Sequence, residues 1–194
     1  MSQSRVSGLT MRIAGVVGAA AWLAVAIAWQ ASNVLERTRP WEGLPRTAYL
    51  VGAAALIVGS VALALTMFHT TEDNRRQATT RIGFIFLAVG LIVSVIAGWA
   101  IPIWAGLYGV AVMTLTRNRT RPRVGWLIGG AFLAAPVAMF VLTALRVGQP
   151  DSYGDYPIAW SAATWVACLG AAAGMALLAR TEPAADRTRL AAGR

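Results

Sequence analysis

The sequence predicts an all-α, polytopic membrane protein with six transmembrane helices, arranged as three consecutive hairpins with both termini inside the cell. Three observations predict this fold class. Only 13% of the 194 residues are charged, against about 25% in an ordinary soluble domain. Long apolar runs alternate with short polar segments, and the mean hydropathy is +0.60. All 17 basic residues are arginines, and they cluster between the apolar runs.

The first apolar run predicts a helix over about residues 13–31, and the second a helix over about residues 48–68. The first run follows a weakly basic start, as in a signal peptide, but it is longer than a usual signal core and more spans follow, so we interpret it as a retained helix. Between the two helices, residues 32–47 hold charged side chains together with Pro40, Gly43 and Pro45. Such helix-breaking residues predict an outer loop.

The third apolar run, residues 82–116, contains no charged side chain in 35 positions. As one straight helix it would be roughly 50 Å long, whereas the hydrocarbon core of a bilayer is about 30 Å thick. Gly98 and Pro102 are residue types that end helices. The run therefore predicts a tight turn at residues 98–102 between two helices, over about residues 82–98 and 101–116.

Two more helices are predicted, over about residues 124–146 and 158–179, which makes the whole chain, residues 1–194, a single transmembrane domain. With six helices and the N-terminus inside, the inner segments hold thirteen arginines and the outer segments four. Cytoplasmic loops carry such an excess of basic residues. A five-helix alternative would put the arginine-rich segment 117–123 outside, so the arginines favour six helices in a bacterial-type plasma membrane.

The composition excludes several classes of function. No predicted helix interior contains Asp, Glu, Lys, Arg or His, which argues against proton-coupled transport, where intramembrane charges are the usual mark. One histidine and one cysteine, Cys168, offer no metal-ligand spacing, and no phosphate-binding glycine motif is present. The arginines lie where membrane topology requires them, so nucleic-acid binding is not expected. We expect neither a metal nor a cofactor.

Aromatic residues gather on the predicted outer side, and two interpretations of them stay open. They could form an interfacial belt that anchors helix ends, or they could wall an outward-facing pocket. The candidate ligand-binding residues of such a pocket are Trp41, Trp99, Trp104, Tyr153, Tyr156, Trp160 and Arg146. The outer loops also supply three weak candidates for catalytic acids, Glu42, Asp151 and Asp155.

Three functions are compatible with this sequence. The first is a non-catalytic accessory or scaffold subunit of a membrane assembly, with the lipid bilayer and other membrane subunits, or further copies of itself, as partners. The second is a substrate-binding membrane component of a transporter that uses the outer aromatic pocket. The third is a small membrane enzyme that acts on a lipid-like or isoprenoid substrate through an outer carboxylate shielded from water.

Overall fold

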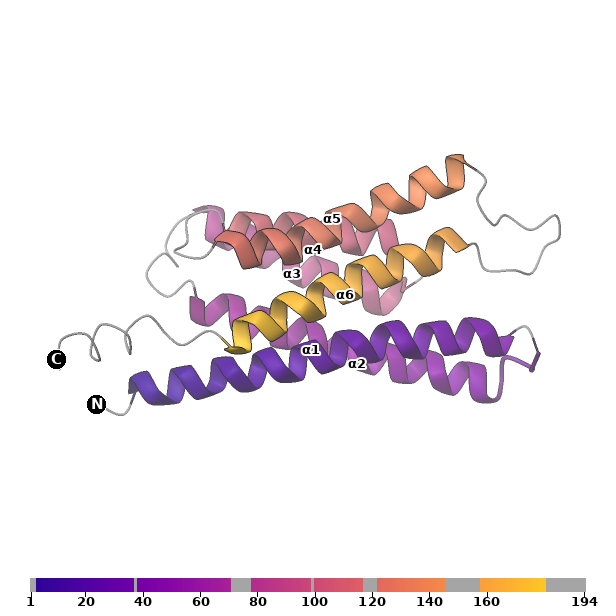
Figure 1. Cartoon of the computed structure of the whole chain (residues 1–194), viewed down its shortest axis with the longest axis horizontal. Coiled ribbons are helices and arrows are strands. Elements are labelled where there is room, and N and C mark those ends of the chain that lie inside the picture. The colour runs from indigo at the N-terminus through magenta and orange to yellow at the C-terminus, as the bar shows by residue number, and fades with distance from the viewer. Residues whose placement is uncertain are drawn as a thin grey trace.

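The chain forms a bundle of long helices (Figure 1). The computed structural model describes residues 3–36, 38–70, 78–98, 100–116, 122–145 and 158–180. Within these ranges lie six helices: α1 (Gln3–Glu36), α2 (Leu44–Thr70), α3 (Ala78–Ile96), α4 (Ile101–Thr116), α5 (Pro122–Ala144) and α6 (Ile158–Arg180). Five of them are long and apolar enough to cross a membrane, and α4 is shorter, with 16 residues. An apolar, all-helical structure of this kind fits an integral membrane protein.

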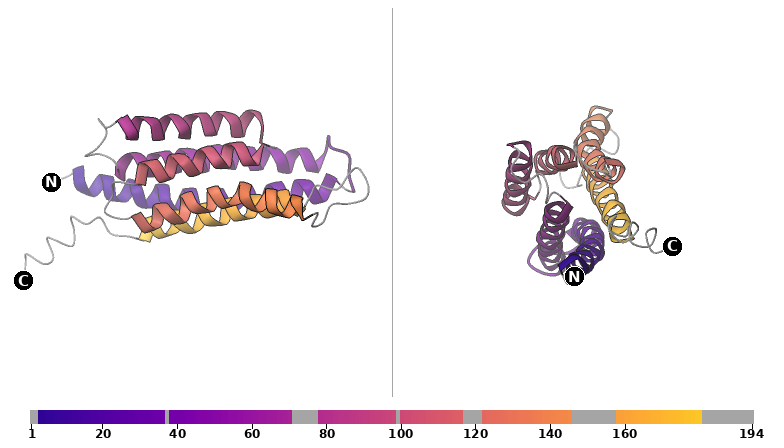
Figure 2. Two further views of the ribbon diagram at one scale, coloured as in Figure 1. Left: turned by 90° about the horizontal axis from the view of Figure 1, so that it is seen from above. Right: turned by 90° about the vertical axis from the view of Figure 1, so that its left-hand side faces the viewer.

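Successive helices run back and forth along one long axis, and the start of α1 and the end of α6 lie at the same end of the bundle (Figure 1). We call this the terminal end, and the opposite end, with the α1–α2 connection, the loop end. α1 packs against α2 and α6, and α5 packs against α6 and α4. α3 packs mainly against α4 and touches α2 only slightly, so it lies at one edge of the bundle (Figure 2).

Two helices extend well beyond their predicted bounds. α1 covers residues 3–36 rather than 13–31, and α2 covers residues 44–70 rather than 48–68. The polar residues just after position 31 do not break a helix, and the first proline after them is Pro40. The α1–α2 connection is therefore residues 37–43, much shorter than the loop predicted over residues 32–47.

The long apolar run is interrupted where its sequence changes character. α3 ends at Ile96 and α4 begins at Ile101. The Ala100 amide donates to the Ala97 carbonyl at 2.8 Å, and the indole Nε1 of Trp104 donates to the Gly98 carbonyl at 3.1 Å. Gly98 and Ala100 are buried. The turn between α3 and α4 is thus packed into the bundle rather than presented to solvent.

Three tryptophans belong to the core of the bundle rather than to an interfacial belt. Trp22 and Trp104 are fully buried, and Trp29 is 7% exposed. Trp41 and Trp126, by contrast, are exposed. The aromatic residues therefore fill the interior as well as marking the helix ends, because large rings supply much of the contact area that holds helices together.

The contact between α1 and α2 is built from indoles seated on glycines. Trp29 lies against Gly52 and Trp22 lies against Gly59. The two tryptophans are seven positions apart on α1, and the two glycines are seven positions apart on α2 in the opposite order, because the two helices are antiparallel. A Cβ atom at Gly59 would lie 3.1 Å from the Trp22 ring, and one at Gly52 would overlap the Trp29 ring. Small residues allow helices to approach closely, which is the main source of helix association in lipid.

Adding one methyl group to these glycines should destabilise the bundle in proportion to the overlap. We expect Gly52→Ala to lower the unfolding free energy by about 1–3 kcal/mol, the usual range for overpacking, and Gly59→Ala to have a smaller effect. Gly106→Ala is the matched control, because no atom lies within 4 Å of a Cβ there. Thermal unfolding midpoints in one detergent measure the series. An equal loss at Gly106 would contradict the packing described here.

Candidate functional site

A small cavity lies at the loop end of the bundle, where α1, α2, α4 and α6 meet the α3–α4 turn. Its volume is about 70 Å³. Its walls are aromatic and its remaining lining is largely polar. The lining residues are Trp29, Ser32, Asn33, Glu36, Trp41, Tyr49, Gly98, Ile101, Trp160 and Thr164.

A continuous series of aromatic rings leads from this cavity into the centre of the bundle. Neighbouring ring centroids along it are 5.2 to 6.1 Å apart. We call it the aromatic column, and in order it consists of Trp41, Tyr49, Trp29, Trp104, Tyr108, Trp22 and Phe132. Most neighbours meet edge to face, the geometry that aromatic pairs favour. The column runs from the cavity lining, at Trp41, Tyr49 and Trp29, to four fully buried rings, those of Trp104, Tyr108, Trp22 and Phe132.

The polar side of the cavity comes from the last two turns of α1. Ser32 is buried, and its Oγ donates to the Pro45 carbonyl at 2.9 Å. This bond ties the first turn of α2 to α1, because the Pro45 carbonyl lies in that turn. Asn33 and Glu36 follow on the same face of α1, and the Glu36 carboxylate is exposed at the mouth of the cavity.

The predicted ligand-binding residues are placed in three ways. Trp41 and Trp160 line the cavity. Trp104 is fully buried below it and uses its indole nitrogen to hold the Gly98 carbonyl. The other candidates, Trp99, Arg146, Tyr153 and Tyr156, lie outside the described residues.

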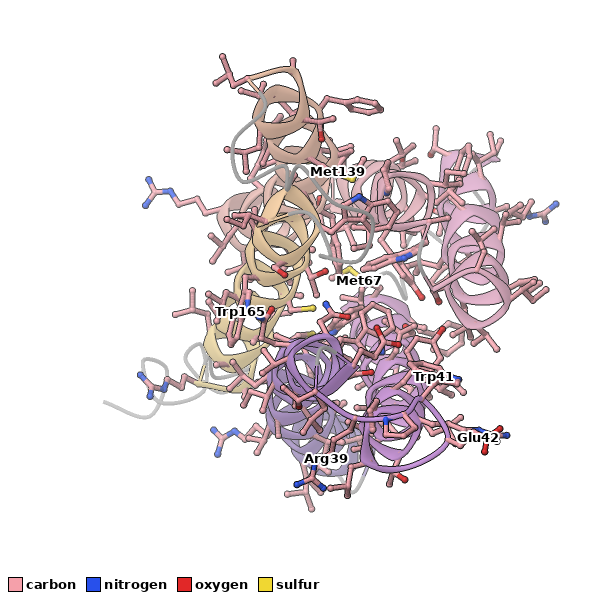
Figure 3. All side chains as sticks on the ribbon, turned by 90° about the vertical axis from the view of Figure 1, so that its right-hand side faces the viewer. Arg39, Trp41, Glu42, Met67, Met139 and Trp165 are labelled. Atoms are coloured by element: carbon pink, nitrogen blue, oxygen red, sulfur yellow. The ribbon has the colours of Figure 1, made fainter. Side chains whose placement is uncertain are left out.

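Only one of the three predicted carboxylates, Glu42, belongs to the part of the chain that the structure describes. Glu42 is exposed and is not among the residues that line the cavity. In Figure 3, Glu42 and Arg39 lie at the periphery of the bundle, whereas Met67 lies near the middle. Asp151 and Asp155 lie outside the described residues. The carboxylate that reaches the cavity is Glu36, which the sequence-based analysis assigned to a loop.

Ser32 and Asn33 were missed as site residues, and Glu36 was expected only among the charges of the outer loops, because α1 was expected to end at residue 31. A signal for them is present in the sequence. Trp29, Ser32, Asn33 and Glu36 are spaced i, i+3, i+4 and i+7, which places them on one face of a helix. Since no proline or glycine intervenes before Pro40, the helix and this face continue to Glu36.

The chemistry available to the cavity is limited. Its volume is several-fold below the roughly 300–1,000 Å³ of small-molecule sites and suits a few water molecules. Among the described residues that line it, Glu36 is the one carboxylate, so these residues supply no pair of carboxylates that could act as acid and base. Within the described residues, no group of three His, Cys, Asp or Glu side chains could hold a metal ion. The cavity is therefore a small space at the loop end of the bundle that side chains largely fill.

The Ser32 bond should contribute to holding the loop end together. We expect Ser32→Ala to lower the unfolding free energy by about 1 kcal/mol, the usual net value of such a hydrogen bond. Amide hydrogen exchange at the start of α2 should also become faster. Thr38→Ala is the control, because the Thr38 hydroxyl makes only a 3.4 Å, exposed bond to the Leu35 carbonyl. Equal effects of the two substitutions would show that the Ser32 bond has no special role.

Comparisons of this chain with protein-family models, curated proteins and solved structures found no match. The function proposed below therefore stands on the residues and packing of the chain itself.

Proposed function

We propose that this chain is a six-pass protein of the plasma membrane, with both termini in the cytoplasm, and that it serves as a non-catalytic subunit that supports a larger membrane assembly. The observation that carries this proposal is the filled interior. The aromatic column occupies the centre of the bundle, where a transport path or an active site would have to open. The cavity that remains at the loop end is only about 70 Å³.

The distribution of described arginines supports the proposed orientation. Exposed arginines Arg12, Arg81, Arg123 and Arg180 belong to the helix segments of the terminal end. Arg39 and Arg46 belong to the loop end. Because basic residues favour the cytoplasmic side, this imbalance favours the terminal end inside the cell.

The outer surfaces of two helices offer room for a partner. In the apolar stretches of α3 and of α5, 28% of the residues are buried inside the bundle, against 50% in α6. On α5, Gly130, Ala134 and Ala138 are spaced four apart and are partly or fully exposed. In lipid, a ridge of small residues at this spacing lets another helix approach closely. We propose that a partner helix packs against this side of α5.

The subunit role is tested by purification from native membranes after mild cross-linking. We expect a second membrane polypeptide to co-purify at a constant ratio and to cross-link to α5. Ala134→Phe should reduce its recovery without lowering the unfolding midpoint, because Ala134 is exposed. Ala54→Phe is the matched control, an equally exposed alanine on α2. Recovery of the wild-type chain alone, or equal loss with both variants, would count against the proposal.

The orientation is tested by cysteine labelling in a Cys168→Ala background. Glu42, Thr79 and Arg123 are exposed and lie before α2, at the start of α3 and at the start of α5. We expect an impermeant maleimide to label Glu42→Cys in intact cells. Thr79→Cys and Arg123→Cys should label only after lysis. Outside labelling of Arg123→Cys with inside labelling of Thr79→Cys would mean that residues 82–116 cross the membrane once.

A second candidate function, a substrate-binding component of a transporter, is favoured by the aromatic walls of the cavity and the carboxylate of Glu36 at its mouth. Binding would require the cavity to enlarge, for which Trp41 is placed at the outer end of the aromatic column and is 44% exposed. Native mass spectrometry of the protein purified from its own membranes tests this. A small molecule retained by the wild type and lost in Trp41→Ala would favour it over the subunit role.

A further inference from the structure

A groove between α2 and α3 is several times larger than the loop-end cavity. Its volume is about 480 Å³, within the range of small-molecule sites. It exists because α3 packs against α4 on one side and touches α2 only slightly. Ala64 on α2 and Ala88 on α3 line the groove with small side chains, which leave it open. At one end, the rings of Phe68 and Phe84 are in contact, with centroids 6.1 Å apart.

The walls of this groove are apolar. Among the described lining residues, the one hydroxyl belongs to Ser60, and it is already hydrogen-bonded inside the protein. Ser60 Oγ donates to the Leu56 carbonyl at 2.7 Å and is 2.6 Å from the Tyr108 hydroxyl. With its proton given to Leu56, Ser60 accepts from Tyr108. No unpaired polar group of Ser60 is left for a ligand, so the groove suits a hydrocarbon chain.

The length of the groove matches one leaflet of a bilayer. It runs along α2 from Ser60 to Phe68, which is about 12 Å at 1.5 Å per residue. Half of a hydrocarbon core is about 15 Å. Phe68 lies near the end of α2 and Phe84 near the start of α3. The groove therefore occupies the half of the bundle nearer the terminal end.

A positive charge lies where a lipid headgroup would be. Arg81 precedes Phe84 by three residues and Ala88 by seven, so it lies on the face of α3 that lines the groove, and it is exposed. Arg81 supplies a described positive charge at this end of the groove, and a guanidinium pairs well with phosphate.

We propose that the groove between α2 and α3 holds one acyl chain of an anionic phospholipid of the cytoplasmic leaflet, with the lipid phosphate at Arg81. The inference rests on the membrane placement proposed above, and it goes beyond the subunit role. The apolar walls of the groove favour an acyl chain, and the length of the groove fits one leaflet. The positive charge of Arg81 favours a negatively charged headgroup.

The test is native mass spectrometry of the full chain released from nanodiscs that contain equal amounts of dioleoyl phosphatidylglycerol and dioleoyl phosphatidylcholine. We expect the wild type to retain one phosphatidylglycerol, with about fivefold preference over phosphatidylcholine, the effect of one arginine near a membrane surface. Arg81→Gln should remove the preference. Ala88→Phe, at an exposed position on the groove wall, should reduce retention of both lipids at least fivefold.

Two control variants separate the site from general effects. Arg123→Gln removes an exposed arginine at the start of α5, away from the groove. Val58→Phe adds bulk to the neighbouring groove between α1 and α2. Both should retain phosphatidylglycerol as the wild type does. If Ala88→Phe fails to fold, Ala64→Leu fills the groove from the opposite wall.

Three results would overturn the proposal: no lipid preference in the wild type, unchanged retention when the groove is filled, or equal losses in the controls. The cysteine-labelling experiment reports separately on membrane placement. Cytoplasmic labelling of Thr79→Cys together with no retained phosphatidylglycerol would reject the lipid site alone. Labelling of Thr79→Cys in intact cells would instead reject the orientation on which both proposals rest.

Discussion

The indole of Trp22 in the notch at Gly59 is the contact on which most of this bundle depends. From α1 the ring touches α2 at Gly59, and it also meets Tyr108 on α4 and Phe132 on α5. Lipid chains are as apolar as the side chains they would replace, so close packing has to hold such helices together. The arrangement has a cost, because the Trp22 Nε1 proton is buried and has no hydrogen-bond partner.

Much of the fold could be predicted from the sequence, because lipid-spanning helices are marked by runs of apolar residues and by the breaks between them. The bounds of α4 agree with the prediction, since Pro102 and the arginines after Thr116 mark both ends. The predicted end of α1 at residue 31 was wrong, because Ser32, Asn33 and Glu36 are polar without being helix breakers.

The burial of individual aromatic residues was harder to predict. Where every face of a helix is apolar, hydrophobic periodicity does not distinguish the buried face from the lipid-facing one. Trp104 was therefore predicted among the aromatic residues of the outer side, although its side chain is fully buried. Only the partner helix carries the signal, in the seven-residue spacing of Gly52 and Gly59. At the loop end, Trp41 and Trp160 could be singled out as aromatic residues of the outer side, whereas Glu36 depended on the missed helix end.

The narrow cavity and the wide groove have one physical origin. Aromatic rings on α1, α2, α4 and α5 fill the centre, and the rings of Trp29 and Tyr49 close over the α3–α4 turn at Gly98. α3 contributes no ring to this column. Its seam of small residues, with Gly83 against Leu115 and Gly90 against Leu107 and Tyr108, faces α4. The centre of the bundle is therefore filled by aromatic rings, whereas the groove beside α3 stays open.

The shortness of α4 has a consequence for how the protein is made. Its 16 residues span about 24 Å, less than the hydrocarbon core. α4 nevertheless avoids a mismatch with lipid, because α3 and α5 flank it and nine of its residues are buried. A segment this short is a poor substrate for insertion by itself. In the six-pass arrangement that we propose, α4 should therefore be inserted together with α3, and it should reach its stable position when α5 encloses it.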